Sequence, residues 1–223
     1  ATAASFKFEK QTLTVPDGFT VELVAGPTLV NRPISIAFDE SGRLYATDSS
    51  GLSERASKQL EEKPHRVVRL EDGDGDGRFE RATEFADRMM FPQGALFHDG
   101  SLFVAAPPHI WKLTDADGDG RADRRTVVLR GLGLGVSDSL ANSLRYHLDG
   151  RVHVANGGNG GRLTSPLREG LSVALGDHDF AFDPDTGEVE LTARTGGGFG
   201  LVFDAWGRGF TTYNIDHIQH RFL

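Results

Sequence analysis

An internal repeat is the feature of this sequence that most restricts its fold. Four segments each contain a short apolar run, a turn built on Asp or Gly, and a second apolar run. They are ISIAFDESGRLYATD (34–48), GALFHDGSLFVAA (94–106), NSLRYHLDGRVHVAN (142–156) and GFGLVFDAWGRGFTTYN (198–214). Their turn glycines are Gly42, Gly100, Gly150 and Gly207. Two apolar runs joined by such a turn predict a β-hairpin.

A second strand–turn–strand unit follows each of the first three hairpins. These units are RVVRLEDGDGDGRFERATEF (66–85), HIWKLTDADGDGRADRRTVVL (109–129) and DFAFDPDTGEVELTA (179–193). One full repeat therefore holds four antiparallel strands in about 50 residues, which is typical of β-propeller blades. A β-sandwich uses similar strands, but it does not account for the repeat. We predict an all-β chain folded as a β-propeller, with one helix candidate at 52–62 inside a loop.

The number of expected strands corresponds to three and a half to four blades. There are two ways to complete the last blade. The fourth blade contains GFGLVF, GRGFTTY and the run 218–223, while FTVELVA (19–25) is a spare strand. If the spare strand closes the fourth blade, sixteen strands form four blades. If the chain is instead part of a larger propeller, its edge strands are open and two copies could pair through them. We assign 1–17 to an N-terminal extension and 18–223 to the propeller.

Two acidic loops resemble the first half of an EF-hand loop. Aspartates stand at positions one, three and five, a glycine stands at position six, and another acid stands at position nine. Because three nearby carboxylates repel one another unless a cation neutralises them, we predict calcium in each loop; the alternative is a solvated Asp-Gly turn. The predicted metal ligands are Asp72, Asp74, Asp76 and Glu80 in the first loop, and Asp115, Asp117, Asp119 and Asp123 in the second.

The twelfth position of each acidic loop carries Thr83 or Thr126 in place of the bidentate Glu of an EF-hand. The missing carboxylate predicts weak calcium affinity, with a dissociation constant of about 10⁻⁴–10⁻³ M as in extracellular modules. Such sites fill only where calcium is plentiful. We therefore expect an exported protein, periplasmic or extracellular.

Polar candidates for function lie on the face opposite the acidic loops, where the second turns and the connections between blades meet. Long loops on a rigid scaffold commonly carry function. We predict catalytic roles for Asp48, which ends a strand, and for His217, which stands in an Asn-x-Asp-His sequence. The predicted ligand-binding residues are Arg32, Gln93, Asn142, Asn156 and Asn214. The alternative for each is structural, because Asn and Asp commonly cap turns and Arg commonly pairs with a neighbouring acid.

The composition excludes several classes of protein. Acidic residues outnumber basic residues by 32 to 24, and this net charge of −8 argues against nucleic-acid binding. The absence of cysteine excludes disulfides, thiolate metal sites, thiol nucleophiles and covalently attached c-type haem in this chain. No apolar run approaches the roughly 18 residues of a transmembrane helix, so we predict no membrane span.

Several stretches resemble a known bacterial family. They are GFTVELVAGPTLVNRPISIAFDESGRLYATD, KPHRVVRLEDGDGDGRF, FPQGALFHDGSLFVAAPPHIWKLTDADGDGRAD and DHDFAFDPDTGEVE. The sequence of residues 18–223 resembles proteins described as membrane-bound dehydrogenases, whose propeller is similar to soluble quinoprotein glucose and sorbosone dehydrogenases. The resemblance implies part of a six-bladed propeller, oxidation of a sugar or alcohol with pyrroloquinoline quinone (PQQ) and calcium, and a cytochrome as electron acceptor. Ser139 stands where those relatives carry a proton-accepting His, and Ser is a poor general base near neutral pH.

Three functions remain open from the sequence. The first is a calcium-stabilised, quinoprotein-like dehydrogenase whose substrate is a small sugar or alcohol. The second is a propeller without catalytic activity that binds a glycan or a protein. The third is a lactonase-like hydrolase with a metal in the channel, held by oxygens of Asn142, Asn214 and Asp48.

Overall fold

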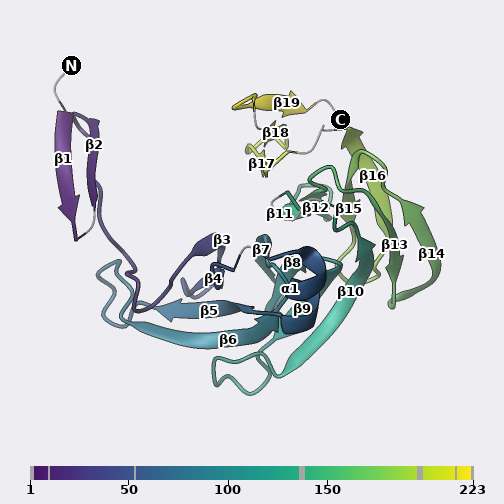
Figure 1. Cartoon of the computed structure of the whole chain (residues 1–223), viewed down its shortest axis with the longest axis horizontal. Coiled ribbons are helices and arrows are strands. Elements are labelled where there is room, and N and C mark those ends of the chain that lie inside the picture. The colour runs from purple at the N-terminus through teal and green to yellow at the C-terminus, as the bar shows by residue number, and fades with distance from the viewer. Residues whose placement is uncertain are drawn as a thin grey trace.

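The structure is a computed structural model that describes residues 3–9, 11–52, 54–135, 139–194, 198–213 and 215–221. Its sheets follow one another along the chain as successive antiparallel blades of a β-propeller, and Figure 1 shows these blades arranged in an arc. The predicted all-β propeller with four-stranded blades is therefore confirmed. The described part of the chain contains no helix that combines the length and apolar character needed to span a bilayer.

The first two blades follow the predicted strand order. Blade 1 consists of β3 (Pro33–Phe38), β4 (Leu44–Asp48), β5 (His65–Glu71) and β6 (Arg81–Met89). Blade 2 consists of β7 (Gly94–His98), β8 (Ser101–Ala106), β9 (His109–Thr114) and β10 (Arg124–Leu132). Helix α1 (Ala56–Glu62) lies in the connection between β4 and β5, inside the range expected for a helix. The two acidic loops join β5 to β6 and β9 to β10, as the repeat predicts.

Blade 3 is interrupted by a hairpin that joins its neighbour. The blade itself consists of β11 (Asn142–Tyr146), β12 (Val152–Ala155), β15 (His178–Phe182) and β16 (Val189–Arg194). Between β12 and β15 the chain forms β13 (Gly161–Ser165) and β14 (Arg168–Ala174), and β13 pairs with the outer strand of blade 2. Residues 161–174 are therefore a two-strand extension of blade 2, whose sheet has six strands.

The N-terminal segment does not complete blade 4. Blade 4 consists of β17 (Gly200–Phe203), β18 (Gly209–Thr212) and β19 (Gln219–Arg221). Near the N-terminus, β1 (Ala3–Phe8) pairs with β2 (Gln11–Pro16) in a hairpin that stands apart from the arc in Figure 1. The expected strand at 19–25 is wrong, because this segment is irregular and lies against blade 1, and of the two alternatives for blade 4 it does not provide closure. Its residue Ala25, with Leu29 and Val30 beyond it, packs on the apolar side chains of β4 and β5.

Apolar side chains between neighbouring blades form the core. The rings of Tyr45 in blade 1 and Phe97 in blade 2 are 5.3 Å apart, and those of Phe103 in blade 2 and Phe182 in blade 3 are 6.3 Å apart. Burial of each large side chain contributes about 2–3 kcal/mol to stability relative to leaving it exposed. Blade-to-blade packing thus fixes the first strands β3, β7, β11 and β17 beside one another, and these strands frame the candidate site.

Candidate functional site

A central cleft lies where the first strands of the blades meet. Its cavity of about 550 Å³ brings together three of the predicted ligand-binding residues, Arg32, Gln93 and Asn142. The cleft is also lined by Pro33, Ile34, Ser35, Ile36, Ser49, Phe91, Ser143, Arg145 and Phe199. An adjoining cavity of about 310 Å³ shares Ser143, Arg145 and Phe199 with the cleft and contains the predicted catalytic residue His217, which is exposed.

Asp48 holds the chain that carries Arg32. Its Oδ1 accepts hydrogen bonds from the backbone N–H groups of Asn31 and Arg32, at 3.0 and 2.7 Å. Its Oδ2 accepts two more from the guanidinium of Arg66, at 3.0 and 2.8 Å. The carboxylate is only 2% exposed. These contacts fit a positioning role for Asp48 better than the role of a base that receives a substrate proton.

Two guanidinium groups give the cleft a positive charge. Arg32 is exposed and donates a long hydrogen bond of 3.5 Å to the carbonyl of Ser50. Arg145 is half-buried and donates to the carbonyl of Leu144 at 2.8 Å. Burial lowers the pKa of Arg145 from its usual value, and no carboxylate pairs with either guanidinium among the residues that the structure describes. Because Arg remains protonated in proteins, both groups are available to an anionic ligand.

Asn142 braces two blades. Its Nδ2 donates to the carbonyls of Leu140 and Gly198, at 2.9 and 3.3 Å, and its Oδ1 accepts from the hydroxyl of Ser143 at 2.7 Å. Gly94 lets the first strand of blade 2 approach closely here, since a Cβ at this position would lie 2.8 Å from the Ser143 nitrogen. The amide of Asn142 is therefore used mainly to fix one wall of the cleft.

Two other predicted ligand-binding residues lie apart from the cleft or outside the described chain. The backbone N–H of Asn156 donates to Asp179 Oδ1 at 2.8 Å, and its side-chain Nδ2 donates to the carbonyl of Gly176 at 3.3 Å. The Asn156 Oδ1 is buried with no hydrogen-bond partner within the described residues. Asn214 lies outside the described residues.

The acidic loops share one backbone arrangement. In the first loop Asp72 accepts hydrogen bonds from the N–H groups of Gly75 and Gly77, and in the second Asp115 accepts from those of Gly118 and Gly120. The Gly77 bond is the largest cause of the lowered pKa of Asp72. One oxygen from each of Asp72, Asp74, Asp76 and Glu80 lies within 4.8 Å of the others, as for Asp115, Asp117 and Asp119. The predicted ligand Asp123 is outside the second group, and its Oδ2 accepts from the Ala116 N–H at 2.8 Å.

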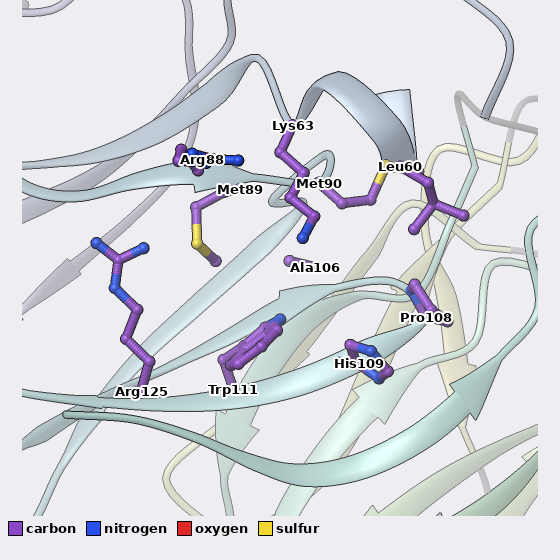
Figure 2. A pocket seen from close by; sticks show the side chains of 10 residues that line it. All are labelled: Leu60, Lys63, Arg88, Met89, Met90, Ala106, Pro108, His109, Trp111 and Arg125. Carbon is purple, nitrogen blue, oxygen red and sulfur yellow. The ribbon is translucent and has the colours of Figure 1, made fainter. Parts of the chain in front are cut away.

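A separate cavity of about 560 Å³ lies beside helix α1 (Figure 2). Figure 2 shows Lys63, Met89 and Arg125 pointing into the space above the ring of Trp111. Arg125 is neutralised by Asp87 at 2.7 Å, and this contact lowers the pKa of the Asp87 carboxyl. Met89 and Met90 are buried and form part of the wall of this cavity.

Sequence reasoning missed several residues of the central cleft, above all Arg145, Ser143 and Phe199. Arg145 and Ser143 lie within the third repeated hairpin, in which we singled out Asn142 and Asn156. The alternation of side chains along that strand is the signal that could have found them, because the side of an inner strand that faces the channel is lined by every second residue.

Comparison with known proteins identifies the family to which this propeller belongs. The fold and the cleft define a β-propeller with a polar, cationic centre. Residues 5–223 match the family described as a domain of unknown function, DUF7133, and the chain belongs to this family. A comparison with curated protein sequences found no match.

Solved structures support the fold. The PQQ domain of pyranose dehydrogenase from Coprinopsis cinerea is similar with a TM-score of 0.62 and 14% identity, over 93% of this chain and 51% of that one. A chain of the nidogen/laminin complex is similar with a TM-score of 0.51 and 16% identity, over 80% of this chain and 56% of that one. The present chain therefore spans about half the length of these structures. At such low identities the likeness establishes the propeller fold alone.

Proposed function

We propose that the central cleft binds PQQ, and that the chain is the calcium-stabilised propeller of a quinoprotein-like dehydrogenase acting on a sugar or alcohol. The observation that carries this proposal is the pair of guanidinium groups, Arg32 and Arg145, which line one cleft without a carboxylate partner among the described residues. PQQ is a flat molecule with three carboxylates, and Arg is the side chain best suited to bind carboxylates.

The chain's own residues fit such a ligand. Arg32 and Arg145 would hold its carboxylates, while the rings of Phe91 and Phe199 line the same cleft and offer apolar surface to a flat molecule. Asp48 supports this arrangement because it holds the backbone of Arg32. When bound, PQQ supplies the two-electron acceptor for the oxidation of an alcohol group.

His217 is the proposed proton acceptor for this reaction. It lines the cavity that adjoins the cleft through Ser143, Arg145 and Phe199, so a substrate in that cavity would lie next to the quinone. Ser139, at the position that the resemblance assigns to the base, cannot take this role near neutral pH. A cytochrome remains the proposed electron acceptor.

Calcium has a structural role in this proposal. The acidic loops join outer strands, whereas the cleft is framed by the first strands of the blades. Bound Ca²⁺ would stabilise the turns of blades 1 and 2. Because this role requires plentiful calcium, it agrees with the proposal that the protein is exported.

A quinone retention assay tests the proposal. The chain is incubated with PQQ and millimolar Ca²⁺ and desalted, and the absorbance of the protein fraction is measured. We expect retained quinone that approaches one molecule per chain. A folded sample that retains no quinone would contradict the proposal and favour a glycan-binding, protein-binding or lactonase-like propeller.

A further inference from the structure

Three blades share the same first turn. In blades 1, 3 and 4 the N–H of the first turn residue donates to the carbonyl four residues later, and the glycine N–H donates back to the first residue. The glycines are Gly42, Gly150 and Gly207, with φ of 79°, 78° and 79°. The first turn residues are Asp39, His147 and Asp204, so blade 3 carries an imidazole where the other two carry a carboxylate.

The charges around the turn of blade 3 also differ. In blades 1 and 4, Arg43 and Arg208 pair with the turn carboxylates of Asp39 and Asp204, both at 2.6 Å. In blade 3 the equivalent Arg151 instead lies 3.5 Å from Glu188 and 3.9 Å from Glu190. The acid of this turn, Asp149, has only imidazoles as ion-pair partners among the residues that the structure describes.

Hydrogen bonds assign the tautomer of the neutral His147 ring. Its Nε2 lies 3.1 Å from the carbonyl of Gly207, which can only accept, so Nε2 carries the hydrogen. In the neutral ring Nδ1 therefore presents a lone pair, and it accepts a long hydrogen bond of 3.5 Å from the Asp149 N–H. The same Nδ1 lies 3.3 Å from Asp149 Oδ2. A lone pair and a carboxylate oxygen this close favour a cation between them.

His153 completes the group. Its Nε2 lies 2.8 Å from Asp149 Oδ2, and its side chain is 3% exposed. One ligand atom from each of His147, Asp149 and His153 lies within 4.8 Å of the other two. Each of the three side chains also lines one of two cavities, of about 460 Å³ beside His147 and about 410 Å³ beside Asp149 and His153, through which a hydrated ion can reach the group.

We propose that His147, Asp149 and His153 form a binding site for a divalent ion of the zinc type. Two imidazoles and one carboxylate suit Zn²⁺ and similar transition metals, whereas Ca²⁺ prefers oxygen ligands alone. Ligands of a tetrahedral Zn²⁺ at 2.0–2.1 Å lie about 3.4 Å apart, close to the 3.3 Å between His147 and Asp149. The distance of 2.8 Å between Asp149 Oδ2 and His153 Nε2 would increase by about half an ångström when a metal replaces the hydrogen bond between them.

The surroundings of His147 match those of a metal-binding histidine. Such histidines commonly donate their second ring N–H to a backbone carbonyl, as His147 does to Gly207. Gly207 belongs to blade 4, and the rings of His147 and Phe203 are 4.4 Å apart across the same boundary. The metal would therefore stabilise the contact between blades 3 and 4. Three protein ligands leave the remaining coordination position to water.

Zinc titration of the full chain, with millimolar Ca²⁺ and Mg²⁺ present to occupy the acidic loops, tests this site. Three variants each remove one ligand: His147→Asn keeps an acceptor for the Asp149 N–H, Asp149→Ser copies Ser41, and His153→Phe copies Phe210. The matched control is Asp177→Asn, which removes an exposed carboxylate 3.3 Å from the imidazole of His178, outside the proposed site. Co²⁺ serves as a spectroscopic probe, because its visible absorption reports tetrahedral coordination.

We expect one equivalent of Zn²⁺ to bind and to raise Tm in the parent chain and in the control. Each ligand variant should weaken binding by more than the roughly 10–100-fold that loss of an outer partner costs. Because the Asp149 side chain is 40% exposed, Asp149→Ser keeps the test decisive if a histidine variant folds poorly. An absence of saturable Zn²⁺ binding, or equal binding by the parent and Asp149→Ser, would overturn the proposal.

Discussion

The guanidinium of Arg69, on β5 of blade 1, lies 3.2 Å from Asp115 Oδ2, the first acid of the acidic loop in blade 2. The Arg69 side chain is 6% exposed and that of Asp115 is 14% exposed, so this ion pair between blades is largely removed from water. Gly120 makes room for it, because a Cβ there would overlap the guanidinium. The second acidic loop is thus both a candidate metal site and a contact between blades.

Replacing Arg69 tests how much this ion pair contributes to stability. Arg69→Met keeps much of the apolar stem but leaves Asp115 partly buried without its partner. Breaking a buried pair in this way costs about 3–5 kcal/mol, which we expect as the loss in the free energy of unfolding in urea. Arg78→Gln, which removes an exposed partner of Glu22, is the control and should change stability by less than about 1 kcal/mol. Equal effects of the two changes would contradict the role given to Arg69.

The repeat was sufficient to predict the blades but not the way segments outside it pack. Hairpin turns depend on local residues, so the positions of Gly42, Gly150 and Gly207 were informative. The segment 19–25 has the alternation of a strand, yet its apolar neighbours cover the open side of blade 1, and this tertiary contact leaves no local signal. The hairpin of β13 and β14 likewise joins blade 2 through pairing of distant residues.

The repeat also predicted part of the central cleft. Arg32, Gln93 and Asn142 were found because they lie at loops and strand ends that the repeat directs to one face. Arg145 was missed because its lack of a carboxylate partner is a property of the folded chain. Asp48 and Asn142 look like ligand residues in the sequence, but their polar atoms are mostly used by neighbouring backbone and side chains.

His65 should make stability fall at acidic pH. The Ser50 N–H donates to its Nδ1 at 3.1 Å, and its Nε2 lies 2.8 Å from Gln59 Oε1, an arrangement that suits the neutral ring. Burial lowers the pKa of His65 below its usual value of about 6.5. The unfolded chain therefore binds more protons as the pH falls, and the stability contributed by His65 is lost below about pH 6.5.

The measurement for His65 is urea unfolding at about pH 7.5 and about pH 5. Burial also lowers the pKa of His109 and His153, so the parent chain alone does not isolate one residue. His65→Gln should lose less stability between the two pH values than the parent does. Equal losses would show that His65 does not contribute to the pH dependence.

Asn142→Asp tests the brace between blade 3 and the segment before blade 4. A carboxylate at this position would face the carbonyls of Leu140 and Gly198 without a donor. We expect a loss of about 1–3 kcal/mol in the free energy of unfolding, as for other buried groups left unsatisfied. An unchanged free energy of unfolding would contradict this role and would mean that the Asn142 amide is available to bind a ligand.

Calcium should raise Tm through the acidic loops. At ten times the dissociation constant, one site contributes about 1.4 kcal/mol, which raises Tm by roughly 3–5 °C in a chain of this size. Asp117→Asn should reduce this rise without lowering Tm in the presence of a chelator. Identical melting curves with excess Ca²⁺ and with a chelator would exclude a stabilising calcium site.

The most direct test of the central claim is an equilibrium titration of the chain with PQQ in millimolar Ca²⁺. We predict saturable binding that Arg145→Met weakens by about 10-fold or more, since a hydrogen bond between charged groups contributes about 1.5–3 kcal/mol. Arg168→Met, on the exposed strand β14, should leave the affinity unchanged. No saturable binding, or an equal affinity for the parent and Arg145→Met, would contradict a quinone site in the central cleft.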